Sequence, residues 1–164
     1  MVDPETRKAS ILEQVQNLAK QAGGAIKEDE DLLNLVNFLV EYPVAIKGDF
    51  DSEFLELPKE LLVISMKYHQ KYFPVWDKKD NLIPCFITVS NMPAETGDEI
   101  KKGNERVLRA RLEDARFFYD EDRKKKIEDF VESLKGVVFQ KKLGTIHEKV
   151  CRITDLAGIL ANLI

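Results

Sequence analysis

The sequence predicts an α+β fold, a helix-rich mixed domain with a small antiparallel sheet. Apolar residues recur at helical spacing in several separate segments, and two β-rich runs flank a short polar turn. Of the 164 residues, 44% are hydrophobic, which is enough to build a core. The charged fraction of 33% predicts a soluble chain without disordered tracts.

Three helices are predicted in the first half of the chain. The first begins at Asp3-Pro4, where a capping residue precedes a proline at the first helical position. Its buried face is predicted by the spacing of Ile11, Val15, Leu18 and Ala22, before Gly23-Gly24. The second begins in the acidic run 28–31 and ends before Pro43. We expect it to bury Leu32, Leu35, Val36 and Leu39. The third begins at Pro58.

The strands are predicted from β-rich runs. Residues 44–47 form one, and residues 71–76 and 82–90 form a hairpin around the polar turn 77–81. Pro74 and Pro84 lack an N–H donor, so we expect an edge or a bulge near them. Residues 137–139 are a short strand or a connector.

The second half of the chain is predicted to be mainly helical. A stretch from 99 to 134 is expected to break near Asp120. A last helix, from Leu143, repeats apolar residues at Ile146, Val150, Ile153, Ala157, Leu160 and Ile164. Because the chain stops within this stripe, we expect the helix to pack on a part of the protein outside these residues.

Several classes of function are disfavoured. No apolar run is long enough to cross a membrane, and residues 1–5 do not resemble a secretory signal. Cys85 and Cys151 are expected to be buried free thiols. His69 and His147 are isolated, and no phosphate-binding loop or nucleophile motif is present, so we expect no metal site, no cofactor and no catalysis in this chain alone.

Charge is unevenly distributed along the chain. The net charge is -4, but residues 1–60 carry 6 Lys and Arg against 13 Asp and Glu, whereas residues 61–164 carry 19 against 16. A basic second half is compatible with a local contact to a polyanion. The run 123–126 is flanked by acidic residues, which favours a solvated helix face over a backbone contact.

An arginine-rich block lies within the long helix. An apolar face is formed by Leu108, Leu112, Ala115 and Tyr119, and at least one of Phe117 and Phe118 is expected to reach the core. In one interpretation Arg109, Glu113 and Arg116 are salt-bridged on a neighbouring face. In the other interpretation, Arg106, Arg109 and Arg111 contact phosphates. Lys101 and Lys102, before the helix, would assist them.

Three stretches in order resemble the beta subunit of the bacterial-type heteromeric glycyl-tRNA synthetase. They are Met66-Lys67 with 70–75, the block GNERVLRARLEDARFFYDED at 103–122, and 139–145 with Glu148-Lys149 and Arg152. In that family the beta subunit holds the tRNA, and the alpha subunit activates glycine with ATP and Mg. The resemblance therefore implies a fragment of a cytoplasmic enzyme, inactive alone, whose partners are the tRNA for glycine and the alpha subunit, with no membrane.

The resemblance also implies an organisation and a site. Residues 1–142 would form a mixed α/β tRNA-binding-type module, and residues 143–164 would begin a helical HD-like module whose His-Asp residues are not in this chain. Lys67 and Lys71 join the block as tRNA-binding candidates. Tyr72 or Phe73 either packs inward or stacks on a base. Two rival functions remain, a scaffold that contacts helices or the alpha subunit, and an editing-type hydrolase.

Overall fold

The computed structural model describes residues 2–163. Contacts divide the chain into two compact units, Met1–Arg116 and Phe117–Ile164. Helix α4, Gly97–Arg123, contributes to both units. The architecture is the predicted mixture of helices with a small antiparallel sheet. The predicted division between residues 142 and 143 into a tRNA-binding-type and an HD-like module stays a prediction.

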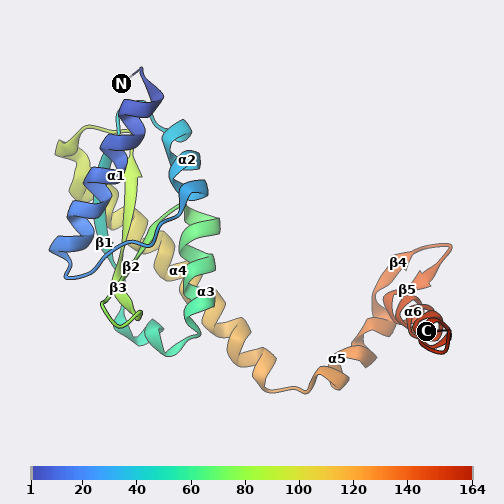
Figure 1. Ribbon diagram of the computed structural model, residues 1–164. Helices are drawn as coiled ribbons and strands as arrows, with labels where there is room; N and C mark the ends of the chain where they lie inside the picture. Colours follow the sequence, from blue (N-terminus) through green and yellow to red (C-terminus); the bar gives the residue numbers. More distant parts are fainter. Residues whose placement is uncertain (1, 164) are drawn as a thin grey trace. The chain divides into compact units, whose positions relative to one another are not determined.

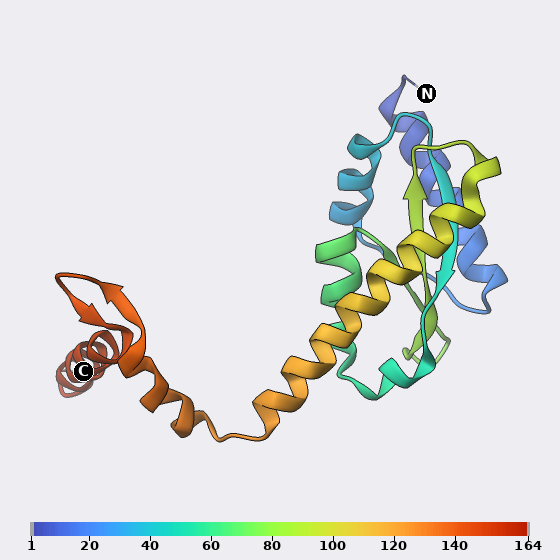
Figure 2. The ribbon, with the colours of Figure 1, turned by 180° about the vertical axis from the view of Figure 1, so that it is seen from behind.

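The first unit is built around a three-stranded antiparallel sheet in the order β1-β3-β2. The strands are β1, Val44–Asp49; β2, Phe73–Trp76; and β3, Leu82–Ser90. Helices α1, Pro4–Gln21, and α2, Glu30–Leu39, lie on one side of the sheet (Figure 1). Helix α4 crosses the opposite side, as the reverse view shows (Figure 2). The sheet therefore separates α1 and α2 from the helix that carries the arginine block.

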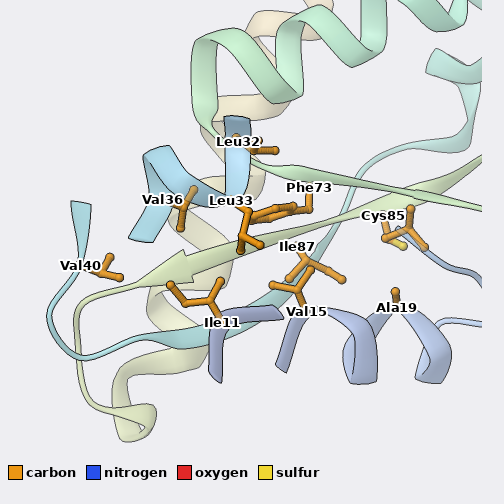
Figure 3. Packing of buried hydrophobic residues seen from close by; sticks show 11 residues of the cluster. Ile11, Val15, Ala19, Leu32, Leu33, Val36, Val40, Phe73, Cys85 and Ile87 are labelled. Atoms are coloured by element: carbon orange, nitrogen blue, oxygen red, sulfur yellow. The ribbon is translucent and has the colours of Figure 1, made fainter. Parts of the chain in front are cut away.

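The core between the sheet and α1 follows from helical and strand periodicity. Ile11, Val15 and Ala19 point from α1 toward Phe73 and Ile87 of the sheet (Figure 3). Asp3 caps α1 by accepting a hydrogen bond from the Thr6 amide (2.7 Å), as predicted from Asp3-Pro4. The predicted stripe is correct for Ile11 and Val15. Leu18 and Ala22 are only half-buried, because Ala19 occupies the centre of the buried face.

The predicted buried face of α2 is partly wrong. Leu32 and Val36 are buried, but Leu35 and Leu39 are exposed, at 43% and 58%. The sheet side of α2 is instead completed by Leu33, which is 6% exposed. A face at spacing 32, 33 and 36 is as compatible with helical geometry as the predicted one. The sequence pattern alone could not choose between two adjacent apolar faces.

The predicted hairpin is confirmed. The ladder between β2 and β3 shifts register between Pro74 and Trp76, a bulge at the predicted proline.

Before β2 the chain forms η1, Ser52–Glu56; α3, Lys59–Ile64; and η2, Ser65–His69, the last a turn of π-helix. The third helix starts directly after Pro58, as predicted. A short turn η3, Ala94–Thr96, leads into α4.

The second unit consists of the end of α4 and five short elements. These are α5, Ile127–Ser133; η4, Leu134–Gly136; β4, Val138–Gln140; β5, Gly144–Thr145; and α6, Ile146–Ala161. None of residues 117–163 is buried. Two expectations are therefore wrong in this structure. Neither Phe117 nor Phe118 reaches the core, and the Cys151 thiol is exposed, whereas Cys85 is buried as predicted. The helical break lies at residues 124–126 rather than near Asp120.

Candidate nucleic-acid interface

Helix α4 presents the arginine block on its solvent side. Leu108 and Leu112 are fully buried, which confirms half of the predicted apolar stripe and fixes the rotation of the helix. Arg106, Arg109 and Arg111 are all exposed. At 100° per residue, Arg106 and Arg109 project to one side of the buried stripe and Arg111 to the other. The block is therefore accessible, but it does not form one continuous cluster.

Basic side chains of α4 face a row of acidic residues that lies outside the helix. Lys101 pairs with Asp49 (2.8 Å), and Arg109 lies 4.0 Å from Asp51. Arg116 pairs with Glu53 (3.4 Å). We call these three pairs the α4 ladder. The predicted salt-bridged interpretation is thus correct in kind, but the partner of Arg109 and Arg116 is not Glu113.

The ladder arises because the acidic residues occur at every second position. Asp49 ends β1 and Asp51 follows it in extended chain, where alternate positions face the same way, whereas Glu53 lies in the first turn of η1. The close succession of Asp49, Asp51 and Glu53 in the sequence is a signal from which this acidic row could be predicted. Burial raises the pKa of Asp49, but hydrogen bonds from Lys101 and Lys47 outweigh it, so the net pKa is lowered. The hydrogen bond to Asp49 raises the pKa of Lys101.

An open hollow of about 440 Å³ lies beside the ladder. Its lining residues are Asp49, Phe50, Asp51, Glu105, Arg106 and Arg109. Glu105 accepts a hydrogen bond from the Asp49 amide (2.8 Å), which holds α4 against the end of β1. Three carboxylates face two guanidinium groups here, so the hollow is not a strong anion site. Arg106 nevertheless forms no ion pair within residues 2–163.

Lys67 lies in the middle of η2 and Lys71 lies two residues after its end, and both are partly buried. Lys67 forms an ion pair with Asp29, and the hydrogen bond between the two side chains raises the pKa of the Lys67 ammonium. Lys71 has a positive φ of 62°, and its ammonium donates to the Tyr68 carbonyl. The structure therefore gives each lysine an internal partner. Their role as tRNA contacts stays a prediction.

The aromatic residues after Lys71 pack inward. Tyr72 and Phe73 are each 3% exposed, so the interpretation of an inward-facing strand is confirmed over stacking on a base. Tyr72 stacks on Phe86 with ring centroids 4.5 Å apart. Its hydroxyl donates to Asn104 Oδ1 (2.8 Å), and burial raises the pKa of Tyr72 to about 12. This hydrogen bond ties the η2–β2 junction to α4.

Lys102 and the basic run 123–126 are solvated. Lys102 is exposed and forms no ion pair within residues 2–163. In the run 123–126 all four side chains are exposed, and Lys124 pairs with Glu121, so the predicted exposure to solvent is confirmed. The predicted helix face is wrong, because only Arg123 is helical and the chain breaks at residues 124–126. Between residues 2 and 163 no three His, Cys, Asp or Glu side chains lie together as a metal site would require. No described helix combines the length and apolarity needed to cross a bilayer.

Comparison with known proteins gives the same family along the whole chain. The model of the family described as glycyl-tRNA synthetase beta subunit matches residues 1–164. The glycine–tRNA ligase beta subunit of Trichlorobacter lovleyi is 53% identical over 162 residues, and that of Geobacter sulfurreducens is 51% identical over 162 residues. The beta subunit of Listeria welshimeri is 49% identical over 162 residues. Each alignment covers 99% of this chain but 24% of the relative.

Proposed function

The chain belongs to the glycyl-tRNA synthetase beta subunit family, and from that premise we propose that it contributes tRNA binding to a glycine–tRNA ligase. The chain spans about a quarter of the length of its relatives, so ligation of glycine to tRNA is a property we propose for the whole assembly. We assign no catalytic residue to this chain. ATP and Mg would be bound by a separate alpha subunit, and the assembly would act in the cytoplasm.

The observation that supports tRNA binding is the group of unpaired cations on α4. Lys102, Arg106 and Arg111 are exposed and have no acidic partner within residues 2–163. A guanidinium group binds a phosphate through two parallel hydrogen bonds, and a lysine binds it as a point charge. These contacts would hold the tRNA in position without reading its sequence.

Binding of this kind depends strongly on salt. Each phosphate contact releases counterions, so the logarithm of the affinity falls with the logarithm of the salt concentration by roughly 0.7 to 0.9 per contact. The acidic ladder residues beside Arg106 oppose a tight contact there. We therefore expect α4 to add to binding by other parts of the assembly rather than to supply it alone.

The test is charge reversal on α4 in the assembled full-length enzyme. Arg106→Glu with Arg111→Glu should weaken binding of a glycine tRNA transcript and lower the salt slope by about 2. Lys78→Glu with Lys79→Glu, in the β2–β3 turn, is the matched control, because both lysines are exposed and form no ion pair within the described chain. Equal affinities for the α4 variant and the control over a range of salt would remove the direct contact.

A second function, a structural scaffold, is favoured by the α4 ladder. Three cations of α4 are already occupied by Asp49, Asp51 and Glu53. In addition, the Arg116 guanidinium carbon lies 4.4 Å from the centre of the Phe54 ring. If reversal of Arg106 and Arg111 lowered stability while tRNA affinity per folded molecule stayed constant, the scaffold role would replace the binding role.

A further inference from the structure

A second concentration of positive charge lies in the other unit, on the β4–β5 hairpin and the start of α6. Residues 138–152 contain four cations and one acidic residue, Glu148. The cations are Lys141, Lys142, Lys149 and Arg152. We call this set the hairpin patch. Its sequence falls within the third stretch that resembles the synthetase beta subunits, and α4 does not account for it.

The hairpin holds its two lysines at a fixed tip. β4 and β5 pair at Val138 with Thr145 and at Gln140 with Gly144. The Leu143 amide donates to the Gln140 carbonyl (2.9 Å), which closes the turn. Lys141 and Lys142 occupy that turn and are exposed. The backbone thus presents two adjacent ammonium groups to solvent from a hydrogen-bonded frame.

The first turns of α6 bring two more cations to the same place. The Lys149 ammonium lies 4.0 Å from the centre of the Phe139 ring, a cation–π contact that holds it beside β4. Arg152 donates from Nη2 to the Leu143 carbonyl (3.2 Å). Because one nitrogen suffices for that bond, the rest of the guanidinium fork stays available. Lys142, Glu148 and Arg152 line an open hollow of about 380 Å³, so one carboxylate lies beside the two cations there.

The one carboxylate of the patch, Glu148, lines the same hollow and is hydrogen-bonded to the start of α6. Glu148 accepts a hydrogen bond from the Thr145 amide (2.6 Å) and completes a capping box at the start of α6. The hydrogen bonds from Thr145 lower the pKa of Glu148. Gly144 makes this possible, because its φ is +81° and a Cβ there would collide with the Glu148 carboxylate. The carboxylate of Glu148 therefore occupies the N-terminus of α6.

The hairpin patch differs from α4 in how its charges are balanced. On α4, Lys101, Arg109 and Arg116 each face a carboxylate. On the hairpin, none of the four cations forms an ion pair with an acidic residue within the described chain. Among residues 2–163, only Arg152 of the four has a carboxylate close enough to interact with it, that of Glu148. Closely spaced cations with so little compensating charge attract a polyanion.

We propose that the hairpin patch binds the phosphate backbone of an RNA strand through Lys141, Lys142 and Arg152. RNA is taken as the polyanion because this inference rests on the proposed function. The two lysines contact successive phosphates as point charges, and Arg152 offers its free nitrogens to a phosphate in the hollow. The contact positions the strand and reads no bases.

The experiment compares two lysine pairs at the tips of two hairpins. Lys141→Ala with Lys142→Ala is the test variant, and Lys78→Ala with Lys79→Ala, exposed in the β2–β3 turn, is the matched control. Both are made in the assembled full-length enzyme, and binding of a glycine tRNA transcript is measured at several salt concentrations. The test variant should lose about tenfold or more in affinity near 0.1 M salt and about 2 in salt slope. The control should match wild type.

The outcomes separate this inference from the proposed function. If the test variant binds like wild type while reversal of Arg106 and Arg111 weakens binding, the hairpin contact is overturned and the proposed function stands. If wild type does not bind tRNA at low salt, both are overturned. If the test variant binds tRNA like wild type but loses its alpha subunit in gel filtration, the hairpin patch is a protein contact and the RNA assignment is overturned.

Discussion

Substitution of Gly48 by alanine is the sharpest test of how α4 is held on the sheet. Gly48 lies in β1 opposite Phe86 of β3. A Cβ at Gly48 would come within 2.7 Å of Phe86 Cε1 and closer still to Cζ. Phe86 is fully buried and stacks on Tyr72, which is hydrogen-bonded to α4, so its ring has little room to move.

The expected cost follows from this geometry. Forcing an extra methyl group into a well-packed core costs about 1–3 kcal/mol. Replacing glycine by alanine also restricts the unfolded chain, which returns about 0.4–1 kcal/mol. We therefore expect Gly48→Ala to lower the free energy of unfolding by roughly 1.3 kcal/mol, within limits of about 0 and 2.6 kcal/mol. Gly103→Ala is the control, since a Cβ at Gly103 meets nothing within 4 Å.

Urea unfolding followed by fluorescence is the assay. Trp76 is the single tryptophan, lies in β2 and is 9% exposed, so it reports on this sheet. Gly48→Ala should lower the midpoint with an unchanged slope, and a further change of Phe86→Leu should recover part of the loss. A midpoint equal to wild type, or no coupling between the two substitutions, would refute the proposed packing of Gly48 on Phe86.

Three further predictions concern single contacts. Because the pKa of Tyr72 is raised to about 12, the stability contributed by its phenol should be complete below about pH 10 and be lost as pH rises toward 12. Urea midpoints of wild type and Tyr72→Phe, compared over this pH range, measure that loss. Gly144→Ala should reduce amide protection at the start of α6, whereas Gly158→Ala, which meets open space, should increase helicity. A double-mutant cycle on Arg109 and Asp51, exposed and 4.0 Å apart, should give a coupling of no more than about 1 kcal/mol. A larger coupling energy would show that the α4 ladder contributes strongly to the stability of the fold.

The sequence was sufficient to predict an element where two neighbouring features indicated the same structure. Asp3 and Pro4 marked the start of α1 by capping and by a fixed φ, and both effects act within four residues. The β2–β3 hairpin was predictable because a polar turn separates two β-rich runs and a proline marks the bulge. In each case the information lay in neighbouring residues, so no knowledge of the rest of the fold was needed.

Predictions from the sequence failed where a residue's burial or its ion-pair partner depends on parts of the chain far away. Leu33 and Leu35 are equally apolar, and only contact with the sheet decides which of them α2 buries. The expectation for Phe117 or Phe118 failed for a similar reason, since helical geometry separates their directions but does not supply a surface to bury them. The partners of Arg109 and Arg116 lie more than 50 positions earlier, in a segment whose acidic residues meet these arginines only once it is folded beside α4.

The arginine block shows why a charged motif does not identify an RNA contact by itself. A cation is free to bind a phosphate only if the fold places no carboxylate opposite it, and that condition depends on tertiary structure. On α4 the condition fails for Lys101 and Arg109, which the sequence singled out, and holds for Arg106. On the hairpin it holds for Lys141 and Lys142, which the sequence did not single out as ligands. If tRNA binding follows unpaired charge rather than the density of arginine, removing the two hairpin lysines should weaken it more than removing Arg109.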